Sequence, residues 1–279
     1  MHMKNYRRLI LSFVLSFLVL LVPWEAIRSV EFSDRMVYLD YVYYQTNVIE
    51  YKDFDSYLSF FTGEWLWHYI LLNVDSYISY ESFFYLISLL TLSLMVFYLV
   101  RKHSLASSLL LINPLVLDLV LSQYRICLAL CFVLLSIFVK HKYISIVLFI
   151  CAMFIHSSIG LLLLIYFTMY WILRLFSDKK NIAIFSLMFL GLIVSWLLSG
   201  YVYAILSFLN DRRAEYDIDR VSSSASYLIF WFLNLLVILF FFLKRGRENI
   251  SEEYGLSIIS LSFISANIIF GGYSTRIIA

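Results

Sequence analysis

The sequence predicts an all-α, polytopic membrane protein that forms a single integral membrane domain over residues 1–279. Of its 279 residues, 62% are hydrophobic and only 14% are charged, whereas soluble domains carry about 25% charged residues. Two prolines and eight glycines leave long, uninterrupted apolar runs. A transmembrane β-barrel would show alternating segments of about ten residues, and the sequence has none. These observations favour helices that cross a bilayer and exclude a soluble globular protein.

About nine transmembrane helices are expected, because nine apolar runs approach the roughly 20 residues that cross a bilayer. The first is expected to be an uncleaved span, since no small-x-small cleavage site precedes Glu25. The expected spans are Leu9–Ile27, Glu81–Val100, Leu105–Leu121, Tyr124–Val139, Tyr143–Ile155, Gly160–Leu175, Ile182–Ser199, Tyr227–Leu243 and Tyr254–Gly271.

Two longer segments, over about residues 28–80 and 200–226, are expected as outer loops. The first is rich in charge and tyrosine, which is typical of an ordered segment at a membrane interface. Within it, the run GEWLWHYILLN at residues 63–73 is too short to span. We therefore expect a short interfacial or re-entrant helix there.

The distribution of charge predicts a cytoplasmic N-terminus. With the nine expected spans, the short turns on one side hold thirteen of the 21 Lys and Arg residues and only four of the 19 acids, as the positive-inside rule requires. Both outer loops then face away from the cytoplasm. The odd number of spans and the apolar run at the C-terminal end favour a chain that continues beyond Ala279.

Three polar residues are predicted to lie at one depth within the membrane. At 1.5 Å per residue, Arg125 lies roughly 22 Å above the basic turn at residues 140–142, and His156 roughly 21 Å above it. Asp118 lies at a similar height on the preceding span. Because bare lipid cannot surround such groups, we expect a recess open to the outer side. Its floor would hold Asp118, Gln123, Tyr124, Arg125, His156, Ser157 and Ser158.

Each of these features also has a purely structural interpretation. Asp118 could pair with Arg125, and His156 could bond a serine at a helix end. The mixed charges of the second loop, which include Arg212, Arg213 and Arg220, are typical of a solvated surface, although they could hold an anionic ligand. The aromatic residues Trp65, Trp67 and Tyr69 are typical of a membrane-interface belt, although they could stack on sugar rings. The three cysteines lack the spacing of a metal site or a disulfide framework, so no metal site is expected.

Three segments resemble the EpsG/Wzy-like family of bacterial polysaccharide polymerases. GEWLWHYILLN is similar to the family's acid-aromatic-Leu-Leu-Asn segment, SQYRICLAL to its arginine-containing helix start, and FIHSSIGLL to its Phe-x-His-Ser-small motif. The resemblance covers roughly Arg28 to Tyr166. The sequence departs from the pattern at Trp65, where the family usually has proline, and at Ile126, where it often has a polar residue. The chain is also shorter than a typical member.

The resemblance implies a glycosyltransferase that polymerises undecaprenyl-diphosphate-linked oligosaccharide repeat units into O-antigen, exopolysaccharide or capsule. It would act on the outer face of the bacterial inner membrane, without a cofactor or nucleic acid. Its expected partners are the lipid-linked glycan, the bilayer, a flippase and a chain-length regulator.

The resemblance also implies roles for particular residues. Arg125, helped by Arg276 or by an arginine of the second loop, would bind the diphosphate. His156 or a nearby acid would orient or deprotonate the acceptor hydroxyl. The candidate catalytic residues are Arg125, His156, Asp118 and Glu64. The candidate substrate-binding residues are Asp40, Gln123, Tyr124, Ser157, Arg212, Arg213, Arg220 and Arg276.

Two other classes of membrane protein remain as alternatives. A flippase or transporter for the same lipid-linked unit tends to have inverted repeats, and no repeat is visible. A membrane acyltransferase that modifies glycans could use a buried histidine, but it would draw on a cytoplasmic thioester, whereas His156 is predicted near the outer side.

Overall fold

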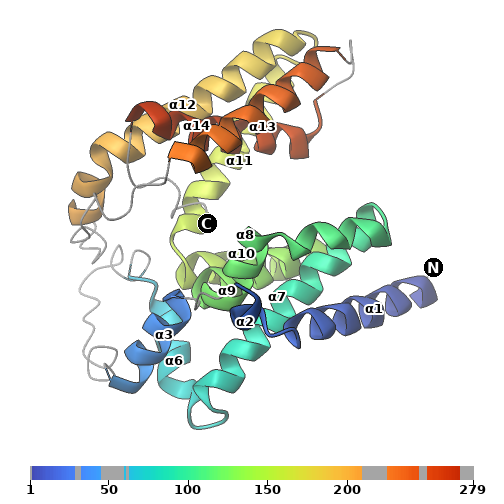
Figure 1. Cartoon of the computed structure of the whole chain (residues 1–279), viewed down its shortest axis with the longest axis vertical. Coiled ribbons are helices and arrows are strands. Elements are labelled where there is room, and N and C mark those ends of the chain that lie inside the picture. Colours follow the sequence, from blue (N-terminus) through green and yellow to red (C-terminus); the bar gives the residue numbers. More distant parts are fainter. Residues whose placement is uncertain are drawn as a thin grey trace. The chain divides into compact units, whose positions relative to one another are not determined.

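The computed structural model of the chain describes residues 2–28, 33–44, 60, 63–208, 225–244 and 250–270 (Figure 1). All regular structure among these residues is helical, which confirms the predicted all-α class for them. The chain divides into two compact units, Met1–Ile159 and Gly160–Ala279. The single membrane domain expected from the sequence stays a prediction.

The first unit is built from eight α-helices and one 3-10 helix among its described residues. They are α1 (His2–Leu20), α2 (Trp24–Arg28), α3 (Ser33–Tyr44), α6 (Trp65–Val74), α7 (Tyr80–Lys102), the 3-10 helix η1 (Leu105–Ile112), α8 (Pro114–Ser122), α9 (Tyr124–Phe138) and α10 (Lys142–Ile155).

The ends of α7 are fixed by local chemistry. The hydroxyl of Ser79 accepts a hydrogen bond from the backbone N–H of Ser82 at 3.4 Å and so caps the helix. Glu81 lies in the first turn, and Arg101 and Lys102 lie in the last. Each charge opposes the partial charge of the helix end beside it, which stabilises the helix. The helix therefore begins and ends within two residues of the expected span.

A polar contact holds α3 against the start of α7. The Tyr43 hydroxyl donates a hydrogen bond to Glu81 Oε1 at 2.5 Å, and its ring meets that of Tyr80 edge-on at 5.7 Å. The hydrogen bond to Glu81 raises the pKa of Tyr43 to about 12. Helix α3 thus gives regular structure to part of the segment expected as an outer loop.

Interhelical hydrogen bonds join α7 to α8 and α9. Ser88 Oγ donates to the carbonyl of Val120 at 2.7 Å, and Thr91 Oγ1 donates to the carbonyl of Cys127 at 3.1 Å. Such bonds between membrane helices contribute on average about 0.6 kcal/mol each, and small side chains let the backbones approach. They set the position of α9 along α7, and with it the position of the polar residues at the start of α9.

The expected span Leu105–Leu121 is broken, so the prediction of one continuous helix is wrong there. The axes of Leu105–Ile112 and Val116–Ser122 differ in direction by 70°. The break falls at Pro114, which has no N–H to donate and whose ring disfavours helical backbone at the residue before it. Asn113 is accordingly extended, with ψ 134°.

The second unit contains α11 (Ser158–Leu175), whose first two residues belong to the first unit, α12 (Lys180–Phe208), α13 (Ala225–Lys244) and α14 (Glu252–Phe270). Helix α14 packs against both α12 and α13. At Gly191 the backbones of α12 and α14 approach so closely that an added Cβ would lie 2.6 Å from the carbonyl oxygen of Ile259 and 2.8 Å from Ser262 Cβ. Ser195 Oγ donates to Asn267 Oδ1 across the same interface at 3.0 Å.

Four helices among the described residues are long and apolar enough to cross a membrane, or five if the bent pair of η1 and α8 counts as one. The four are Tyr80–Lys102, Ser158–Leu175, Lys180–Ser199 and Glu252–Phe270. Three shorter apolar helices, Tyr124–Phe138, Lys142–Ile155 and Leu228–Lys244, accompany them. The count of nine spans and the cytoplasmic N-terminus stay predictions.

Substitution of Gly191 should loosen the second unit. We expect Gly191→Ala to lower stability by about 1–3 kcal/mol, because the new methyl group meets backbone and Cβ atoms that cannot move aside. The control is Gly255→Ala, whose Cβ would meet the flexible end of Met169 at 2.9 Å. Thermal unfolding of the purified protein in detergent measures both. Equal melting temperatures for the two variants would contradict the close packing of α12 on α14.

Candidate active site

Glu64, in the first unit, has a backbone conformation that is unusual for a residue other than glycine. Its φ of 57° and ψ of 46° place it in the left-handed region, and no other described non-glycine residue has a positive φ. That conformation costs roughly 1–2 kcal/mol for a residue with a Cβ. Such strain persists only where the surrounding contacts hold it, and it is concentrated at functional sites.

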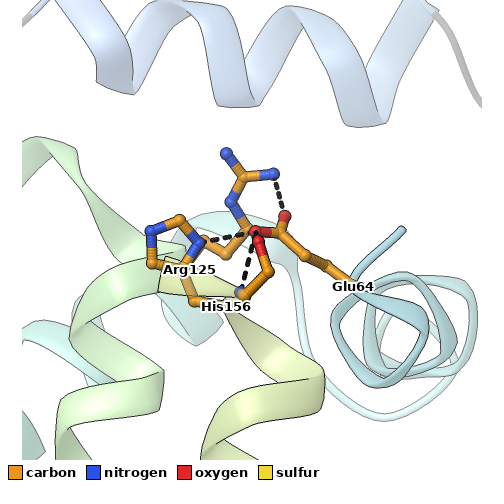
Figure 2. Close-up of polar contacts among 4 residues, drawn as sticks. Glu64, Arg125 and His156 are labelled. Atoms are coloured by element: carbon orange, nitrogen blue, oxygen red, sulfur yellow. Dashed lines mark hydrogen bonds and ion pairs between the residues drawn. The ribbon is translucent and has the colours of Figure 1, made fainter. Parts of the chain in front are cut away.

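The conformation turns the Glu64 side chain away from its own helix. The carbonyl of Glu64 accepts the first amides of α6, from Trp67 at 3.0 Å and His68 at 3.4 Å. Its side chain makes no cap to that helix. The residue is 3% exposed, and the carboxylate reaches into the interior of the first unit, between α9 and the end of α10 (Figure 2).

Three residues converge on this carboxylate. Arg125 Nη1 forms an ion pair with Oε2. His156 Nδ1 lies 2.6 Å from Oε1. Ser157 donates to Oε1 through its backbone N–H at 3.3 Å and through its hydroxyl at 3.4 Å. Figure 2 shows the guanidinium and the imidazole approaching the carboxylate from different sides.

The breaks between helices place these donors. Arg125 lies in the first turn of α9. His156 follows the last residue of α10 with extended backbone, φ −147° and ψ 111°, and α11 begins at Ser158. The N-terminal end of α11 lies beside the carboxylate, since the Ser157 N–H donates to it. Because helix N-termini carry partial positive charge, this end adds to its stabilisation.

The site is an anion-binding centre occupied by a side chain of the protein itself. A buried carboxylate is tolerated only with opposite charge and hydrogen bonds, and Glu64 has both. Arg125 is less buried, with 29% of its side chain exposed. Its guanidinium can therefore serve the buried acid and a ligand outside it. A bidentate donor of this kind is suited to carboxylate and phosphate oxygens.

The other candidate residues that the structure describes differ in their surroundings. Tyr124 belongs to the hydrophobic core, where its ring stacks on Phe84 at 4.4 Å and 5°. Gln123 is half-buried at the N-cap of α9, and its side chain forms no cap. Asp118 is half-buried on α8, and Asp40 is exposed on α3. The binding residues expected among the arginines, Arg212, Arg213, Arg220 and Arg276, lie outside the described residues.

The sequence left the acid of the site undecided among several candidates, and the structure gives Glu64 as a partner of both Arg125 and His156. His68 was not among the candidates, although it is buried in α6, four residues after Glu64. The signal in the sequence is a histidine within a short apolar run, because a buried polar side chain needs a hydrogen-bond partner. Within the described part of the chain no group of three or more His, Cys, Asp or Glu could hold a metal ion.

The buried charge predicts an unequal effect of two substitutions. Glu64→Ala should lower stability by about 1–3 kcal/mol, because it removes the buried carboxylate that the partly buried Arg125 and His156 contact. The matched control is Glu25→Ala. The pair of Glu25 with Arg35, at 3.2 Å, is exposed and should contribute at most about 1 kcal/mol. Thermal unfolding in detergent measures both, and similar losses would contradict the burial of the Glu64 pair.

Comparison with known protein families gives a match for this chain. The model of the EpsG family matches residues 8–279, nearly the whole chain and all the residues of the site. Neither the curated proteins nor the solved structures contain a match. Membership of this family, together with the apolar helices, indicates a membrane protein of the polysaccharide polymerase type. The chain, with its buried Glu64, Arg125 and His156, belongs to the EpsG family.

Proposed function

We propose that this protein polymerises undecaprenyl-diphosphate-linked oligosaccharide repeat units on the outer face of the bacterial inner membrane. The observation that carries the proposal is the convergence of Arg125 and His156 on the Glu64 carboxylate. The guanidinium of Arg125 is suited to binding phosphate, and the imidazole of His156 is suited to proton transfer. The transfer of a glycan from a lipid diphosphate to a hydroxyl group needs both functions. Membership of the EpsG family supports a polysaccharide as the product of the reaction.

Arg125 binds the diphosphate of the donor. Its partly exposed guanidinium and the N-terminal end of α9 present positive charge to phosphate oxygens. When the bond between the anomeric carbon and the diphosphate breaks, the electron pair stays on the leaving oxygen. Arg125 stabilises the charge that develops there, and this electrostatic role requires no metal.

His156 removes the proton from the acceptor hydroxyl. Glu64 bonds the Nδ1 side of the ring, so it holds the proton at Nδ1 and leaves Nε2 as the basic nitrogen. The acceptor oxygen attacks the anomeric carbon as its proton moves to Nε2. Glu64 then stabilises the resulting imidazolium. Glu64 thus acts as a positioning residue for both His156 and Arg125.

The charge pattern supports a site on the outer side of the membrane. The basic residues gather in the turns opposite to the predicted level of Arg125 and His156. A site on the outer side meets repeat units that a flippase has already transferred. A chain-length regulator would then act on the same growing glycan.

Loss of either catalytic group should stop chain growth. We expect Arg125→Ala and His156→Ala to leave single repeat units on the lipid and to abolish long glycan, which a glycan gel displays as a lost ladder. The controls are Arg101→Ala and His141→Ala, two exposed residues of the same types outside the site. Normal ladders from the site variants at wild-type protein level would contradict the proposal. A complete loss of outward-facing repeat units would indicate a flippase instead.

Kinetics should separate the roles of the three residues. Arg125→Lys should raise KM for the lipid-diphosphate donor and also lower kcat, because one point charge replaces the guanidinium fork. His156→Gln should lower kcat by about 10²-fold or more with a smaller effect on KM. Glu64→Gln should also lower kcat, because Glu64 positions His156 and stabilises its imidazolium. Assays with purified protein in lipid discs measure both constants, and an unchanged kcat for Glu64→Gln would exclude its role as a positioning residue.

A further inference from the structure

Helix α6 has two faces with different surroundings. Trp67, His68 and Leu71 are buried on one face. Trp65, Tyr69 and Asn73 follow each other at intervals of four residues on the other face, and Tyr69 and Asn73 are exposed. Because each residue turns the helix by about 100°, Trp65 lies on this second face near its edge, and it is half-buried.

Three aromatic side chains on this second face form one surface, which we call the aromatic platform: Phe60, Trp65 and Tyr69. The rings of Trp65 and Tyr69 are stacked, with centroids 5.5 Å apart and an interplanar angle of 27°. Phe60 packs on Trp65 from the preceding segment at 5.9 Å. Tyr69 is 53% exposed and Phe60 36%, so the platform presents ring surface outside the core.

The contrast with Trp67 shows that core packing does not explain the platform. Trp67 is 1% exposed, and its ring meets Tyr38 edge-on at 5.8 Å. A helix of this unit thus buries one tryptophan fully, whereas Trp65, two residues earlier, is only half-buried. The rings of the platform contact each other, which keeps them in place for a ligand without loss of further side-chain freedom.

A sugar ring is the ligand whose chemistry fits this surface. A pyranose has an apolar face of C–H groups, which packs on an aromatic ring, and a rim of hydroxyl groups, which need hydrogen-bond partners. The Tyr69 hydroxyl and the amide oxygen of Asn73, whose Nδ2 donates to the carbonyl of Tyr69 at 2.7 Å, belong to the same face and can bond such hydroxyl groups. Trp65 and Tyr69 are roughly 6 Å apart along the helix axis, a length comparable with a sugar ring. The residue before Trp65 is Glu64, so the platform begins beside the backbone of the residue that contacts Arg125 and His156.

We propose that the aromatic platform is a glycan subsite that binds sugar rings next to the reacting end of the chain. This inference rests on the proposed polymerase function and adds to it a place where the non-reacting sugars are held. It also assigns Trp65 and Tyr69 a role distinct from that of aromatic residues in a membrane-interface belt.

The test is direct binding of a phosphate-free glycan. The probe is a fluorescently labelled oligosaccharide, released by mild acid from the surface polysaccharide of cells that carry the protein. Binding to purified protein in lipid discs is measured by fluorescence anisotropy. We expect Trp65→Ala and Tyr69→Ala each to weaken binding about tenfold or more. Loss of one stacking ring has an effect of this size in proteins that bind single-stranded nucleic acids. Trp65→Phe should keep most of the affinity.

Two controls distinguish the subsite from a membrane belt. Trp171→Ala removes an exposed tryptophan of α11 and should leave binding unchanged. Trp65→Leu keeps apolar area but has no ring face, so it should bind as weakly as Trp65→Ala. Unchanged affinity of all the Trp65 variants, or no binding of the probe to the wild-type protein, would overturn the proposal and leave the platform as a belt.

Binding of the phosphate-free glycan does not depend on the proposed role of Arg125 in binding diphosphate. Arg125→Ala should bind the phosphate-free probe with wild-type affinity while chain growth stops. Chain growth that persists in Arg125→Ala would contradict the proposed function but not the subsite. Loss of binding in Trp65→Ala with an intact Arg125 would support the subsite whatever the fate of the proposed reaction.

Discussion

A carboxylate that leaves water must find opposite charge, and the first unit is arranged around this requirement at Glu64. The acid lies where the start of α6, the start of α9 and the end of α10 meet, and its two oxygens contact Arg125, His156 and Ser157. None of these contacts lies within one helix. Each depends on the packing of the others, and the hydrogen bonds from α7 to α8 and α9 fix that packing. The strained backbone of Glu64 is tolerated because so many partners hold it.

Apolar length and local end signals predicted most of the helices. The ends of α9 and α10 lie within one residue of the expected spans Tyr124–Val139 and Tyr143–Ile155. The break at Pro114 was missed because hydropathy averages over a run and does not register one residue without an N–H. Helix α3 was missed because charged and aromatic residues hide its periodicity, and its contact with Glu81 comes from a distant part of the chain.

The site was predictable only in part, for a geometric reason. Helix rise gives the height of Arg125 and His156 but not the direction in which their side chains point. The sequence could not show that Glu64, just before a separate short helix, contacts both Arg125 and His156. That contact depends on the left-handed backbone of Glu64. Asp118, placed at the same height, was as plausible a partner as Glu64 from the sequence. The depth of a residue in the membrane limits which acids could pair with Arg125 and His156. Only the tertiary contacts show which acid does.

The distances along the chain between these partners have a consequence for how the protein is made. Glu64 is separated from Arg125 by 61 residues and from His156 by 92. During synthesis the acid therefore emerges well before either counter-charge. Its helix is too short to cross a bilayer, so we expect the carboxylate at the aqueous interface until its partners are made. The centre can be completed only once residue 156 of 279 has been synthesised, and a nascent chain that stalls before His156 keeps an acid without that partner.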